Sequence, residues 1–195
     1  IFYVLIVPAI SYFLFSKKIH WSVWPSVFVC IIGGFLLTEI NNVTVRLGDS
    51  LVLLGAFFWA FHIVYLSKFL KLFNYPIAIT MGTCLIGSIV AFIPSLAFEN
   101  ITLGNLMMEK NELLYAGVLS SGIAFLLQAL SQQNLSPAPV AIIFSLEGVF
   151  AAIFGLIILN QFLSELKISG IVLILFAVIF SQLAPIYGKK SYGRN

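Results

Sequence analysis

The sequence predicts an all-α integral membrane protein with about seven transmembrane helices. The 195 residues are 61% hydrophobic and only 9% charged, and the mean hydropathy is +1.10. Soluble domains carry about 25% charged residues, so a soluble fold of this length could not cover its surface with so few charges. The apolar residues also fall into long continuous runs, and no run alternates as a strand of a membrane barrel does. The chain must therefore expose apolar surface to lipid.

The number of helices follows from the lengths of these runs, because a helix needs about 20 apolar residues to cross a bilayer. The first run is short. Since the chain starts at Ile1 inside it, we expect the sequence to be part of a longer protein. No connection is long enough to hold a soluble domain. In order, the predicted spans cover residues 1–15, 22–38, 50–67, 75–97, 112–131, 137–159 and 168–187.

Local signals set some of the boundaries. Asp49 or Ser50 is expected to cap the N-terminus of the third span. Pro76 is expected in the first turn of the fourth, where its missing N–H costs nothing. The longest connection, about a dozen residues from Glu99, is expected to be a loop.

The charged residues predict the orientation. Seven of the ten basic residues fall on alternate connections, and six of the seven acids fall on the others. The positive-inside rule then makes the first side, and the C-terminus, cytoplasmic. We expect the membrane to be the bacterial inner (plasma) membrane. The cytoplasmic set is Lys17, Lys18, Lys68, Lys71, Lys189, Lys190 and Arg194, and the outer set is Arg46, Lys110 and Lys167 with Glu39, Asp49, Glu99, Glu109, Glu112 and Glu165.

An internal repeat is visible between residues 7–37 and residues 147–180. Each stretch has an apolar run, a short polar break and a second apolar run rich in small and β-branched residues. The second and seventh spans are five apart, and a five-helix repeat must enter the membrane upside down in its second copy. Inverted repeats are typical of secondary transporters, whose substrate sites lie near the midplane between the halves.

The residues from 49 to 187 resemble the second repeat of EamA-like proteins of the drug/metabolite transporter superfamily. The motifs that carry the resemblance are short, but they occur in the family's order and spacing. They are Gly48-Asp49, Trp59-Ala60, Ala129-Leu130, Ser136-Pro137, Leu146-Glu147 and Gly170.

The resemblance implies a ten-helix transporter of two inverted five-helix repeats. Residues 1–48 would be the truncated end of the first repeat with two helices, 49–187 the second repeat with five, and 188–195 a basic cytoplasmic tail. Two positions depart from the family. Gly148 stands where proline is usual, which is expected to keep a flexible point but remove the rigid kink. Asn160-Gln161 stands where Gly-Glu is usual, which removes an acid at the outer membrane edge.

Glu147 is the foremost candidate for a functional residue, because it is the only acid inside a span. An ionised carboxylate there costs about 2.5–3.5 kcal/mol and should face other helices or a water-filled cavity. It would bind a cationic group or carry a proton. The alternative is a structural hydrogen bond to a neighbouring helix.

Four further residues are cavity candidates. Trp59 and His62 are three apart and so share a helix face, where they would line a cavity or pack in the core. Ser121 and Gln128 are seven apart on the fifth span and share a face with Gln132, which should point at other helices rather than at lipid.

Several functions are disfavoured by the sequence. No enzyme signature or paired intramembrane carboxylate is present, and Cys30 and Cys84 lie in apolar runs, so we expect no enzyme, metal or cofactor. The sequence has no basic patch that would indicate binding to nucleic acid. The expected function is a permease that moves a small metabolite, such as an amino acid or a drug-like compound, by alternating access. The expected partners are the lipid bilayer and that solute, and coupled protons and a homodimer stay open. The alternative is a non-transporting assembly or lipid-handling subunit without a central cavity.

Overall fold

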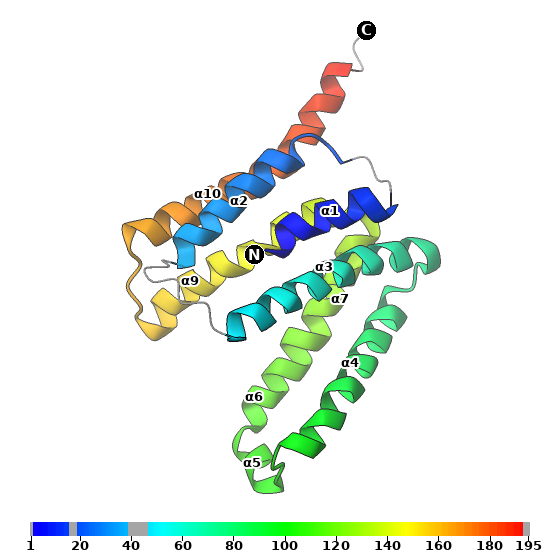
Figure 1. Ribbon diagram of the computed structural model, residues 1–195, viewed down its shortest axis with the longest axis vertical. Coiled ribbons are helices and arrows are strands. Elements are labelled where there is room, and N and C mark those ends of the chain that lie inside the picture. Colours follow the sequence, from blue (N-terminus) through cyan, green and yellow to red (C-terminus); the bar gives the residue numbers. More distant parts are fainter. Residues whose placement is uncertain (1, 16–18, 39–46, 193–195) are drawn as a thin grey trace. The chain divides into compact units, whose positions relative to one another are not determined.

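The structure is a computed structural model that describes residues 2–15, 19–38 and 47–192, and these are almost entirely helical, with no strand (Figure 1). Its elements are α1 (Tyr3–Phe15), α2 (Val23–Thr38), α3 (Leu47–Phe73), α4 (Pro76–Phe98), α5 (Leu103–Met108), α6 (Lys110–Leu114), the π-helix η1 (Tyr115–Ile123), α7 (Ala124–Asn134), α8 (Pro137–Phe144), α9 (Leu146–Leu159) and α10 (Glu165–Tyr192). The predicted all-α class is confirmed.

Five helical stretches in this part of the chain are long and apolar enough to cross a membrane, and two shorter apolar helices precede them. Each coincides with one of the predicted segments, although the number of crossings stays a prediction. The orientation also stays a prediction. It depends partly on Lys17, Lys18, Glu39, Arg46 and Arg194, which lie outside the described residues. The long stretches are Leu47–Phe73, Pro76–Phe98, Lys110–Asn134, Pro137–Leu159 and Glu165–Pro185, and the short ones are Tyr3–Phe13 and Val23–Thr38.

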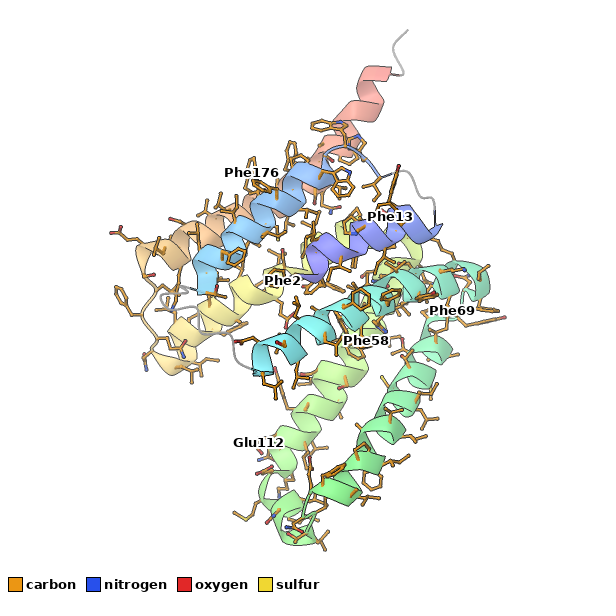
Figure 2. The ribbon with its side chains drawn as sticks, in the orientation of Figure 1. Phe2, Phe13, Phe58, Phe69, Glu112 and Phe176 are labelled. Carbon is orange, nitrogen blue, oxygen red and sulfur yellow. The ribbon has the colours of Figure 1, made fainter. Side chains whose placement is uncertain are left out.

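Large aromatic side chains on these helices leave much of their surface exposed. Phe58 on α3 is 63% exposed and Phe176 on α10 is 57% exposed (Figure 2). Phe13 on α1 is exposed as well. A soluble protein rarely shows so much contiguous apolar surface, whereas lipid covers it at no cost.

The chain divides into two compact units, one formed by residues 1–65 with 136–195 and the other by Leu66–Leu135. In the first unit α8 packs against α1, α2 and α10. Its core consists mainly of small and β-branched side chains, which allow helices to approach closely. They include Val4, Val7, Val27, Ala141, Ile142, Ile174 and Ala177.

The tightest contact of the first unit joins α2 to α10, which run side by side (Figure 1). Gly33 meets Gly170 near one end of the pair, and the ring of Trp21 meets that of Phe180 near the other, at 6.1 Å between centroids. As the residue number rises on one helix it falls on the other, so the two helices are antiparallel. An inverted repeat requires this relation between its second and seventh spans.

The second unit is a helical hairpin in which α4 packs against η1 and α7 (Figure 1). At the end of the hairpin where the turn joins α3 to α4, Leu66 and Leu70 of α3 cluster with Ala129 of α7, and Ile79 of α4 packs against them. Pro76 lies in the first turn of α4, as predicted. A hydrogen bond of 2.8 Å from Gln133 Nε2 to Asn74 Oδ1 ties α7 to the turn between α3 and α4.

Two boundary expectations are wrong. The third span begins at Leu47, so Asp49 lies inside its first turn, where a carboxylate favours the helix dipole, and does not cap it. The connection after Glu99 is not a simple loop but contains α5, which Thr102 caps by accepting from the Asn105 N–H at 3.3 Å, and α6. The short helix α5 is mostly apolar and was not predicted because polar residues flank it.

A turn after α9 explains one departure from the family pattern. Asn160 has φ 50° and ψ 33°, the left-handed conformation that usually requires glycine but that asparagine tolerates. The next amide, Gln161 N–H, donates to the Gly155 carbonyl at 3.1 Å and closes the helix end. Asparagine is therefore suited to the left-handed residue that ends α9.

Replacing Asn160 tests this role. We expect Asn160→Val to lower the free energy of unfolding by about 1–2 kcal/mol, because a β-branched residue is strained at positive φ. Asn160→Gly is the matched control and should leave stability unchanged or slightly higher. Thermal unfolding of the two variants in detergent measures the difference, and equal stability would show that the turn is not strained.

Candidate functional site

The span that carries Glu147 is interrupted at Ser145, between α8 and α9. The Ser145 amide donates to the Ile142 carbonyl at 3.1 Å and the Gly148 amide to the Ser145 carbonyl at 3.2 Å, both across three residues instead of four. The Ser145 hydroxyl also donates to the Ile142 carbonyl, at 2.5 Å. The helix therefore changes its hydrogen-bonding pattern here without proline. The expectation that Gly148 keeps a flexible point but removes a rigid kink stays a prediction, and the irregularity seen at Ser145 consists of local three-residue bonds.

Glu147 lies in the first turn of α9, directly after this break. It is the eleventh of the 23 residues of Pro137–Leu159, which is the middle of the span. Its side chain is exposed, whereas Ser145, two residues earlier, is buried. The carboxylate is therefore not sealed into dry packing among the described residues.

The phenol of Tyr3, on α1, lies within electrostatic range of Glu147. Tyr3 itself is 9% exposed. Cys30 of α2 interacts with Tyr3 and, through its thiol, with the Ser145 side chain. Ser145 at the break therefore has the Cys30 thiol of α2 beside it, and the Tyr3 phenol of α1 interacts with both Cys30 and the Glu147 carboxylate. A phenol next to a carboxylate suits a cation or a proton.

Trp59 and His62 lie together on α3, as their spacing predicted. Their rings stack with centroids 5.0 Å apart and an interplanar angle of 20°. Both side chains are partly buried. Aromatic residues also recur at every fourth position along this helix, and the rings of Phe57 and Phe61 are 4.9 Å apart. A stacked indole and imidazole form a flat surface that suits both packing and ring-shaped solutes.

The fifth-span candidates belong to the second unit. Gln128 is 7% exposed and Gln132 is fully buried, so the face that they share points at protein, as predicted. Ser121 lies in η1 and is partly buried. Its carbonyl accepts a weak bond from the Cys84 thiol at 3.9 Å. The π-helix was not predicted, although π-helical turns often occur near functional sites.

Several residues near these candidate sites were not predicted from the sequence. Tyr3 and Ser145 sit in apolar runs with no motif around them, and only tertiary packing brings Tyr3 to Glu147. Ser67, a buried polar residue of the second unit, was also missed. A hydroxyl in an apolar run is a weak signal, because most such groups bond to their own helix.

Within the described ranges, no group of three His, Cys, Asp or Glu residues is arranged to hold a metal ion. Cys30 and Cys84 are free thiols.

The helices and their exposed apolar surface define an integral, multi-pass membrane protein with a polar break in one span. A family model agrees with this class and narrows it. Residues 46–183 match the EamA-like transporter family, so the chain belongs to that family. The resemblance inferred from the short motifs is thereby confirmed, and the family indicates a membrane transporter in contact with the bilayer rather than an enzyme.

Curated relatives point the same way. The chain is 28% identical over 184 residues to an uncharacterized transporter of Archaeoglobus fulgidus, covering 93% of this chain and 58% of that protein. It is 32% identical over 182 residues to an uncharacterized transporter of Methanothermobacter thermautotrophicus, covering 88% of this chain and 51% of that protein. A WAT1-related protein of Arabidopsis thaliana is 30% identical over 142 residues, which is 69% of this chain and 38% of the relative.

The chain thus spans between half and three fifths of the length of the two archaeal relatives. No solved structure matches it.

Proposed function

We propose that this chain is the larger part of a secondary transporter that moves a small metabolite across the membrane by alternating access. The observation that carries the proposal is the exposed Glu147 side chain, at the middle of a span that is interrupted at Ser145. Transporters commonly build their binding sites from interrupted helices near the midplane. An ionisable residue at that depth is costly, and it usually serves substrate binding or proton transfer.

In this proposal Glu147 binds a cationic group of the solute or a proton, and Tyr3 supports it through its hydroxyl. Trp59, His62, Ser121 and Gln128 are the remaining proposed substrate-contacting residues. The relatives named as transporters support the general activity but name no solute.

The proposed architecture is the inverted repeat, with residues 1–48 ending the first five-helix copy and 49–187 forming the second. The antiparallel pair of α2 and α10 supports it, since equivalent helices of inverted copies run in opposite directions. We also propose a cytoplasmic C-terminus in a bacterial inner membrane, on the strength of the charge distribution.

The proposal is tested by uptake into proteoliposomes that contain the full-length protein. Labelled amino acids, monoamines and quaternary ammonium compounds are offered with and without an imposed pH gradient. We expect at least one cationic or zwitterionic solute to accumulate above the level in protein-free liposomes. If no solute of the panel enters under either condition, the non-transporting alternative replaces the proposal.

A further inference from the structure

Four buried polar side chains of the second unit have atoms without a hydrogen-bond partner among the described residues. Ser67 and Gln132 are 0% exposed, Thr80 is 6% exposed and Gln128 is 7% exposed. The unpaired atoms are Ser67 Oγ, Thr80 Oγ1, Gln128 Nε2, and both Nε2 and Oε1 of Gln132. All four side chains are uncharged. Together they supply hydroxyl and carboxamide groups that both donate and accept.

Other hydroxyl residues in the same unit behave differently. Ser88 donates to the Cys84 carbonyl at 2.7 Å, Thr83 to the Thr80 carbonyl at 2.9 Å, and Ser131 to the Leu127 carbonyl at 2.8 Å. A hydroxyl on a membrane helix normally satisfies itself in this way. The Ser67 and Thr80 hydroxyls make no such bond to a carbonyl of their own helix, so they are oriented differently from the other hydroxyl groups of this unit.

The four side chains occupy one end of the unit. At about 1.5 Å per residue, each lies within about 10 Å of the end of its helix at Phe73, Pro76 or Asn134. These ends meet, because a short turn joins α3 to α4 and the Gln133 to Asn74 hydrogen bond joins α7 to that turn.

The packing of the three helices places the polar residues around one cluster. Leu66, Ile79 and Ala129 belong to the apolar contact between α3, α4 and α7. Ser67, Thr80 and Gln128 are the immediate chain neighbours of these three residues, and Gln132 lies one turn beyond Gln128. The four polar residues therefore lie at the same level of the same three helices.

We propose that Ser67, Thr80, Gln128 and Gln132 form a binding site for an uncharged hydrogen-bonding group of a solute, a hydroxyl or a carboxamide. Two carboxamides and two hydroxyls match such a group in both donors and acceptors, and they bring no formal charge that would favour an anion or a cation. The site rests on the proposed function, because transport supplies the solute. It adds a recognition element for a neutral polar group that is separate from the Glu147 carboxylate.

Alkylation of an introduced cysteine tests the site with a probe of the proposed chemistry. Iodoacetamide is an uncharged carboxamide and iodoacetate is its anionic analogue. The full-length protein, with Cys30→Ala and Cys84→Ala, carries Gln132→Cys, and the exposed control carries Asn134→Cys. We expect the ratio of the iodoacetamide to the iodoacetate rate to be at least tenfold higher at position 132 than at position 134. An excess of acetamide should slow alkylation at 132, and choline should not.

Absence of alkylation at 132 under conditions that label 134, or equal rate ratios at both positions, overturns the site. Thr80→Cys provides a second variant on another helix if Gln132→Cys does not fold, and it is expected to show the same preference. Solute uptake is measured on the wild-type protein. Selective alkylation without solute uptake would support the binding site but contradict the proposed transport function. Solute uptake without selective alkylation would support the transport function but contradict the binding site.

Discussion

Gly170→Leu is expected to destabilise the protein more than any other single change in the first unit. A Cβ at position 170 would lie 2.6 Å from the Gly33 carbonyl oxygen and 2.8 Å from the Leu37 amide nitrogen. Favourable contacts between heavy atoms begin near 3.5 Å, and backbone atoms cannot rotate away as a side chain can. We expect a loss of about 3 kcal/mol in the free energy of unfolding, or no accumulation of folded protein.

Gly33→Leu is the reciprocal change. Its Cβ would lie 2.9 Å from the Gly170 carbonyl oxygen and 2.9 Å from Ile174 Cγ1, so the expected loss is similar. Gly82→Leu on α4 is the matched control, because nothing lies within 4 Å of that position. Leucine also favours a helix over glycine, so the control should be neutral or stabilising. Thermal unfolding in detergent compares the three variants, and equal losses at all three positions would contradict the close α2–α10 contact.

Glu147→Gln is expected to lower solute uptake at least tenfold and to remove its dependence on an imposed pH gradient. The substitution keeps the size of the side chain but removes the charge that would hold a cation or exchange a proton. A hydrogen bond to a charged group contributes about 1.5–3 kcal/mol, which corresponds to roughly tenfold to a hundredfold in binding. Tyr3→Phe removes only the neighbouring hydroxyl and should act in the same direction with a smaller effect.

The control for this prediction is Glu165→Gln, which neutralises an exposed acid in the first turn of α10. Its uptake should match that of the wild type. Uptake is measured in proteoliposomes that contain equal amounts of each protein. A Glu147→Gln variant that keeps both the rate and the pH dependence would make Glu147 a structural residue.

The positions of the helices were predictable because lipid imposes a simple rule on length and composition. Leu47–Phe73, Pro76–Phe98 and Pro137–Leu159 all coincide with predicted apolar runs. The shared face of Trp59 and His62 was also predictable, since it depends only on helical periodicity.

Features that depend on tertiary packing or backbone detail were not predictable. The break at Ser145 depends on a serine hydroxyl that bonds its own helix, and serine does so at many sites without breaking a helix. The proximity of Tyr3 to Glu147 joins residues more than 140 positions apart. The unpaired state of Gln132 depends on what the neighbouring helices fail to supply, which no local pattern encodes.

The departure at Asn160 shows how structure changes the meaning of a sequence difference. As a sequence difference it was the loss of a family Gly-Glu pair. In the structure it preserves the left-handed turn that ends α9, because asparagine tolerates positive φ. The acid of the family's pair is absent, because Gln161 follows Asn160.

Solute counterflow tests alternating access most directly. Proteoliposomes with the full-length protein are loaded with an unlabelled solute that the uptake screen identifies, and are then diluted into a trace of the same solute in labelled form, with no ion gradient. A carrier that exposes one site to each side in turn must accumulate the label transiently above its equilibrium level. We expect this overshoot in the wild-type protein. A monotonic approach to equilibrium, or no entry of label, would contradict alternating access.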